Sequence, residues 1–189
     1  MKTIGEAFND LRASLENNMN HICRNDDINE SQAGHFPAAI LIIVGSAALS
    51  RLQGAEGEAH VFVGMMADHG VESLLARKLF DALRHGLAHF WETKLLDVGR
   101  QEHVELVVSW KKKRHLSLRS SPSPGLYLNV RTMWGDLQKA LTQYAVVLEG
   151  DPKTAGSSAP SRVTSLTEDQ TTLEAWRWFQ AKAPKEEAS

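Results

Sequence analysis

The feature that most constrains this chain is an apolar run without a single charge, from Phe36 to Ser50. A helix that crosses a membrane needs about 20 such residues, and this run has 15. A helix that is apolar on every side is otherwise stable only when other elements surround it. The run therefore predicts a helix in the middle of a soluble helical bundle, and no membrane association.

Helical periodicity on both sides of this run supports a mainly helical fold. Apolar positions recur at helical spacing in 4–22, 71–91 and 132–148, and 59–67 suits a short helix. Between 91 and 132 the period changes to two, which is typical of strands. We expect a strand over 103–110, its hairpin partner over 115–119, and a third short strand over 126–130. The sequence thus predicts a bundle of four to five helices with a small β-hairpin insertion.

Composition changes near residue 150. Residues 150–165 are rich in Pro, Gly, Ser and Ala, which favours a flexible linker. Residues 166–189 contain a short predicted tail helix that carries Trp176, Trp178 and Phe179. We expect this helix to dock on its own domain or on a dimer mate, and binding to another protein is the alternative. Residues 1–149 are the predicted helical domain.

Charge and cysteine content exclude several functional classes. The formal net charge is −2, so any nucleic-acid site must be a local basic patch. Cys23 is the single cysteine, which excludes an internal disulfide and fits a reducing cytosol. The first 16 residues lack the apolar centre of a signal peptide, so a cytoplasmic location is expected.

The segment 71–91 places a polar motif opposite its apolar stripe. That motif reads Arg84-His85-Gly-Leu-Ala-His89. It resembles the hallmark of the HEPN family (higher eukaryotes and prokaryotes nucleotide-binding domains): an Arg, a polar Asn, Asp or His, a few residues, and then a His late in a bundle helix. The order of an apolar helix, the motif helix, a hairpin and a closing helix is also similar, over roughly residues 4–148.

The resemblance implies a metal-independent endoribonuclease without a cofactor or bound metal. Such cleavage uses the 2′-hydroxyl as nucleophile and requires an acid, a base and a cation for the charged phosphorane. By resemblance Arg84 binds the scissile phosphate, His89 transfers protons, and His85 orients these groups or holds substrate. A homodimer supplies the second Arg/His pair, and family members often act as toxins or in phage defence. The alternative is an inactive interaction module with an antitoxin-like protein partner.

Two weaker patterns accompany the motif. His85 and His89 have the i, i+4 spacing of metal ligands, but a third ligand such as His60, His69 or Asp81 would have to come from elsewhere, and we assign no metal site. Four cationic side chains lie at the predicted hairpin turn. They either bind RNA phosphates or form a solvated turn whose charges prevent aggregation at the strand edge. These residues are Lys111, Lys112, Lys113 and Arg114.

Overall fold

A computed structural model describes residues 2–24, 35–86, 94–97, 102–110, 115–119 and 124–160. The helices are α1 (Ile4–Arg24), α2 (His35–Leu52), α3 (His60–Ala67), α4 (Ser73–His85), α5 (Val130–Gly150) and α6 (Pro152–Gly156). The strands are β1 (Lys94–Asp97), β2 (Glu102–Ser109), β3 (Ser117–Arg119) and β4 (Gly125–Asn129). The predicted fold class is confirmed: the chain is a helical bundle with a small sheet between α4 and α5.

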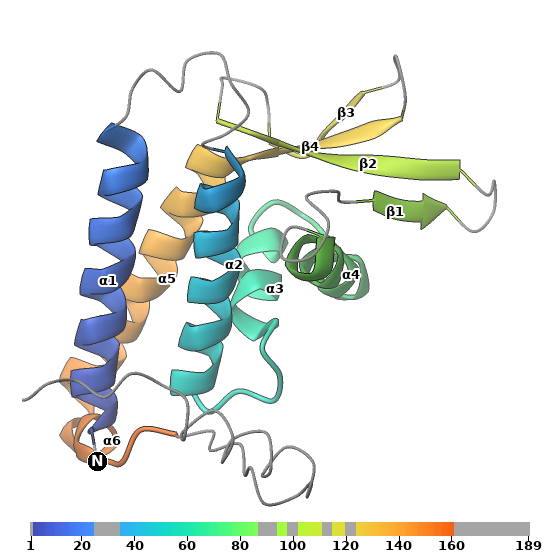
Figure 1. Ribbon diagram of the computed structural model, residues 1–189. Coiled ribbons are helices and arrows are strands. Elements are labelled where there is room, and N and C mark those ends of the chain that lie inside the picture. Colours follow the sequence, from blue (N-terminus) through green and yellow to red (C-terminus); the bar gives the residue numbers. More distant parts are fainter. Residues whose placement is uncertain are drawn as a thin grey trace, which may run out of the picture.

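Helix α2 is the centre of the bundle and packs against α1, α3, α4, α5 and β2. Helices α1, α2 and α5 stand side by side, while α3 and α4 lie against the other flank of α2 (Figure 1). By length and composition α2 is the one described helix that could cross a membrane, and 56% of it is buried inside the fold. Burial on this scale is also what the central helix of a bundle shows.

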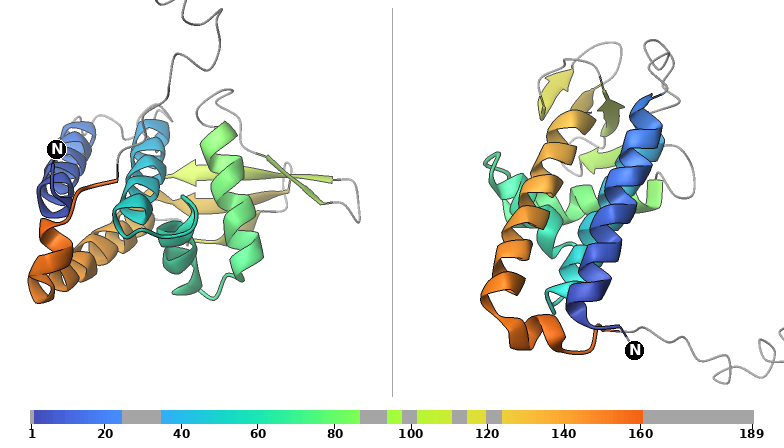
Figure 2. Two further views of the ribbon diagram at one scale, coloured as in Figure 1. Left: turned by 90° about the horizontal axis from the view of Figure 1, so that it is seen from below. Right: turned by 90° about the vertical axis from the view of Figure 1, so that its left-hand side faces the viewer.

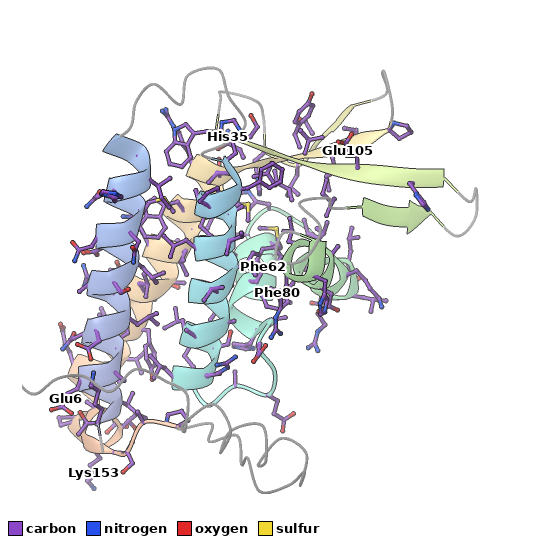
Figure 3. The ribbon with its side chains drawn as sticks, viewed as in Figure 1. Glu6, His35, Phe62, Phe80, Glu105 and Lys153 are labelled. Atoms are coloured by element: carbon purple, nitrogen blue, oxygen red, sulfur yellow. The ribbon has the colours of Figure 1, made fainter. Side chains whose placement is uncertain are left out.

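Aromatic contacts fix the outer helices to this core. The rings of Phe62 on α3 and Phe80 on α4 lie 5.6 Å apart between centroids (Figure 3). On the other side of the bundle, Phe8 of α1 meets Tyr144 of α5 edge to face at 5.4 Å. The Tyr144 hydroxyl donates a hydrogen bond of 2.7 Å to the Leu52 carbonyl at the end of α2. The ring contact between Phe62 and Phe80 thus holds α4, the motif helix, against α3, and α4 also packs directly on α2.

The sheet differs from the predicted hairpin. Its strand order is β1-β2-β4-β3, in which β2 and β4 run parallel while the outer pairs are antiparallel. Residues 115–119 therefore do not pair with 103–110 as predicted, because β4 lies between them, and β1 was not predicted at all. Burial explains the order: Leu128 of β4 is fully buried, whereas Leu118 of the edge strand β3 is 81% exposed.

Composition predicted a flexible linker from residue 150, but residues 151–160 remain part of the domain. Asp151 caps α6 by accepting hydrogen bonds from the backbone N–H groups of Lys153 and Thr154, at 3.1 and 3.3 Å. Beyond α6 the backbone returns to the start of α1, where Ser158 forms a β-bridge with Thr3. Figure 2 shows α6 and this returning segment beside the N-terminus. The predicted tail helix and residues 161–165 lie outside the described residues.

Gly45, in the middle of α2, lets two neighbouring helices approach closely. A Cβ atom at this position would lie 2.8 Å from a methyl carbon of Leu15 on α1 and 3.1 Å from one of Leu137 on α5. Gly64 of α3 is also helical, but a Cβ there would meet nothing within 4 Å. Glycine 45 therefore sets the spacing of three helices.

This difference gives a stability prediction. Gly45→Val should lower the free energy of unfolding by about 1–3 kcal/mol, because overpacking forces neighbouring side chains out of place. The same substitution at the exposed Gly64 should change it by less than about 0.5 kcal/mol. Urea unfolding monitored by circular dichroism measures both values, and equal losses at the two positions would contradict this account of α2.

Candidate functional site

The polar motif begins in the last turn of α4. The helix starts at Glu72, whose carboxylate accepts hydrogen bonds from the backbone N–H groups of Leu74 and Leu75 at 2.9 and 3.2 Å. Its apolar side is buried against the bundle through Ala76, Leu79, Phe80 and Leu83. Arg84 and His85 follow on the exposed side, as the periodicity predicts. His89 lies outside the described residues, as do the four cations of the basic turn.

Arg84 belongs to an ion-pair cluster that joins α4 to the segment after α2. Glu58 receives hydrogen bonds from both Arg84 and Arg51, with the Arg51 Nε atom 3.0 Å from its carboxylate. The bond from Arg51 lowers the pKa of the Glu58 carboxyl, and the charge of Arg84 lowers it further, so Glu58 is ionised at neutral pH. Two guanidinium groups then share one carboxylate, which leaves one net positive charge.

A small cavity of about 120 Å³ opens beside this cluster, between α2 and α4. The Arg84 side chain is 46% exposed and lines the cavity together with Glu58 and Arg51. Its other wall is the outer surface of α2, where Val44 is 59% exposed. This arrangement offers a guanidinium group and an adjoining apolar surface to a ligand, a substrate or another chain.

A second cluster lies at the other end of α4, where α3, α5 and the sheet meet. His69 comes just after α3, Asp136 lies in the first half of α5, and His115 precedes β3. The Nε2 atom of His69 lies 2.8 Å from a carboxylate oxygen of Asp136. The rings of His69 and His115 meet edge to face, with 4.8 Å between centroids. One ligand atom from each residue fits within 4.8 Å of the others.

Hydrogen bonding fixes the protonation of His115. Its Nδ1 atom accepts a 3.0 Å hydrogen bond from the backbone N–H of Asn129, so the proton of the neutral ring lies on Nε2. That Nε2 atom is buried without a partner among the described residues. Burial lowers the pKa of His115 to about 4, and the neighbouring charge of His69 acts in the same direction. The ring is therefore neutral at pH 7.

This protonation state weighs against a metal ion between the three side chains. A histidine ligand binds metal through a nitrogen lone pair and donates the N–H of its other nitrogen to an acceptor. His115 shows the reverse pattern, since Nδ1 accepts and Nε2 carries the proton. The cluster fits better as an Asp136–His69 pair that holds the His69 ring in one orientation beside a neutral His115.

The backbone next to His115 is strained. Leu116 has φ +57°, which a non-glycine residue rarely adopts, and its backbone N–H donates to the Tyr127 carbonyl at 2.8 Å. Leu116, His69, His115 and Ser117 line an open cavity of about 380 Å³. Sequence reasoning considered His69 only as a third ligand for His85 and His89, placed His115 beside the basic turn, and did not single out Asp136. Only the packing of α3, α5 and the sheet brings these distant positions together.

Comparisons of this chain with protein-family models, curated proteins and solved structures find no match.

The lowered pKa of His115 predicts a loss of stability in acid. In an unfolded chain this ring titrates near 6.5, so its contribution is fully present above pH 6.5 and declines as the pH falls toward about 4. His115→Asn keeps an acceptor for the Asn129 N–H but does not titrate. The melting temperature of this variant should therefore fall less between pH 7 and pH 5 than that of the original protein. Differential scanning fluorimetry at both pH values measures this effect.

The control for this experiment is His60→Asn, which replaces an exposed histidine on α3. It should keep the full acid dependence of the original protein. An equal acid dependence in all three proteins would mean that His115 is not held neutral by the fold.

Proposed function

We propose that this chain is a HEPN-like protein of the cytoplasm that binds and cleaves RNA without a metal ion, as a homodimer. The observation that carries the proposal is the position of Arg84. It lies on the polar side of α4, which packs against the buried α2, and its side chain is 46% exposed. Its cluster with Arg51 and Glu58 keeps one net positive charge. An excess cation on an open surface suits the binding of a phosphate.

Each residue of the motif then has a distinct role. Arg84 pairs with the scissile phosphate and stabilises the charge of the phosphorane. His89 exchanges protons with the 2′-hydroxyl or the leaving 5′-oxygen, and His85 orients substrate or His89. A second protomer supplies the other Arg/His pair across a two-fold axis near the end of α4. A role as a toxin or in phage defence is part of the same proposal.

One observation favours a second candidate, an interaction module without catalysis that pairs with another protein. Glu58 already pairs with Arg84, so a phosphate would have to compete with an ionised carboxylate. In this alternative, the Arg51–Glu58–Arg84 cluster joins α2 to α4 and supports a binding surface for an antitoxin-like protein. The two candidates make opposite predictions for RNA.

RNA cleavage is the first test. Purified protein should cut mixed RNA in the presence of EDTA, leave 2′,3′-cyclic phosphate ends and spare DNA, which lacks the 2′-hydroxyl. His89→Ala should lower the rate about 10²–10⁴-fold through lost proton transfer. Arg84→Ala should lower it about 10²–10³-fold through the uncompensated phosphorane charge. Gel electrophoresis of labelled RNA measures the rates.

Arg77→Ala provides the matched control, because Arg77 is another exposed arginine of α4 outside the motif. It should retain the original rate. Full activity in His89→Ala would overturn the mechanism. Inactivity of the original protein, together with normal folding, would favour the interaction module.

Glu58→Gln tests whether the carboxylate restrains Arg84. Two unit charges about 4 Å apart in water interact by about 1 kcal/mol, so removing this carboxylate should raise RNA affinity about fivefold. The free energy of unfolding should fall by no more than about 1 kcal/mol, since the arginine side chains of both pairs are about half exposed. Asp10 of α1 forms an exposed ion pair with Lys2. Asp10→Asn removes the same charge there and should leave RNA affinity unchanged. Fluorescence anisotropy with labelled RNA measures both, and equal affinities in the two variants would contradict the role of Glu58.

A further inference from the structure

The outer surface of α2 is an apolar stripe without a partner among the described residues. The positions that are not buried there recur every three or four residues: Pro37, Leu41, Val44, Ala48 and Arg51. Four of these are apolar, and Arg51 at the end of the helix is the one charge. A helix on the surface of a soluble protein normally turns a polar side toward water. This stripe therefore has the character of a docking surface.

Two adjoining cavities lie along this surface of α2. The cavity beside Arg84 shares Ala48 and Arg51 with a second cavity of about 220 Å³ between α1 and α2. Pro160, the last described residue, lines that second cavity. Backbone hydrogen bonds hold the chain at this point, since the Ala159 N–H donates to the Lys2 carbonyl at 3.0 Å. Residues 161–189 therefore start at one end of the apolar stripe.

The sequence of the tail is complementary to the stripe. In the predicted helix 166–182, Leu166, Asp169, Leu173 and Trp176 have the i, i+3, i+7, i+10 spacing that places residues on one side of a helix. Over 166–176 this side is apolar except for Asp169, and Arg177 and Gln180 continue the same side toward the end of the helix. The α2 stripe is likewise apolar except for one guanidinium group. Asp169 follows one turn after the start of the tail helix, and Arg51 lies near the end of α2 where the tail begins.

The lengths of the linker 161–165 and of the tail helix also match the length of α2. Residues 161–165 can span up to about 17 Å when extended. The distance along α2 from Leu52 to Val44 is about 12 Å, at 1.5 Å per residue. A helix over 166–182 is about 25 Å long, and α2 is about 27 Å long. One tail helix that runs back along α2 therefore covers its stripe.

We propose that the tail helix 166–182 docks in cis along the outer surface of α2, with Asp169 at Arg51 and with Leu173 and Trp176 over Val44 and Ala48. Docked in this way, the tail covers the cavity beside Arg84. This docking does not depend on the proposed function.

Thiol labelling of the full chain tests the docking directly. In a Cys23→Ser background, Val44→Cys places a single thiol within the stripe. Adding Trp176→Asp should raise the rate of labelling by a maleimide about tenfold or more, because the tail then leaves the stripe. Trp178→Asp introduces the same change on the opposite side of the tail helix and should leave the rate unchanged.

A second reporter separates docking from unfolding. Val147→Cys on α5 starts from a valine of similar exposure, 55% against 59% for Val44. Its labelling rate should be the same with tryptophan or aspartate at position 176. A rise at both reporters would show that Trp176→Asp loosens the whole fold, and Asp169→Arg then replaces it as the variant that opens the stripe.

Two results would overturn the proposal. Fast labelling of Val44→Cys that neither Trp176→Asp nor Asp169→Arg changes would mean that the stripe is uncovered. Slow labelling that becomes fast on dilution would mean that a second copy of the chain covers it. Neither labelling rate involves RNA, so the experiment tests docking even if the protein does not cleave RNA.

Discussion

Burial of α2 is the constraint on which the rest of the structure depends. No single neighbour can cover a helix that is apolar around most of its circumference, so α1, α3, α4, α5 and β2 all pack against it. Gly45 lets α1 and α5 approach at the same level of the helix, which fixes the layer of three long helices. The position of α4, and with it Arg84, follows from the flank of α2 that these helices leave open.

The helices could be predicted from the sequence because their signal is local. Apolar residues three and four positions apart locate each helix, and a capping box in which Thr3 and Glu6 bond each other's backbone N–H groups starts α1. Strand pairing is not local. A two-residue period located β2 and β4, but nothing in it says that β4 enters between β2 and β3. The choice depends on which strand buries more apolar surface, and this becomes visible only in the folded chain.

The same distinction divides the two candidate sites. Exposure of Arg84 and His85 follows from their place on an amphipathic helix, so periodicity was sufficient to predict it. The partner of Arg84 was not predictable, because Glu58 comes from a loop 26 positions earlier. His69, His115 and Asp136 carry no common spacing at all. They meet because α3 ends, α5 begins and β3 starts in one corner of the fold. Contacts of this kind depend on how the helices and the sheet pack together, and residue spacing in the sequence does not predict them.

The β-bridge between Thr3 and Ser158 has a consequence for biosynthesis. Backbone hydrogen bonds from Ile4 to Ser157 and from Ala159 to Lys2 join the first turn of α1 to the segment after α6. A ribosome that makes this chain must release residue 159 before the first turn of α1 can gain these bonds. The first turn of α1 can thus gain its final backbone contacts only after all residues from 4 to 159 have been made. A nascent chain that stalls before this point leaves the backbone groups of Lys2 and Ile4 without these hydrogen-bond partners.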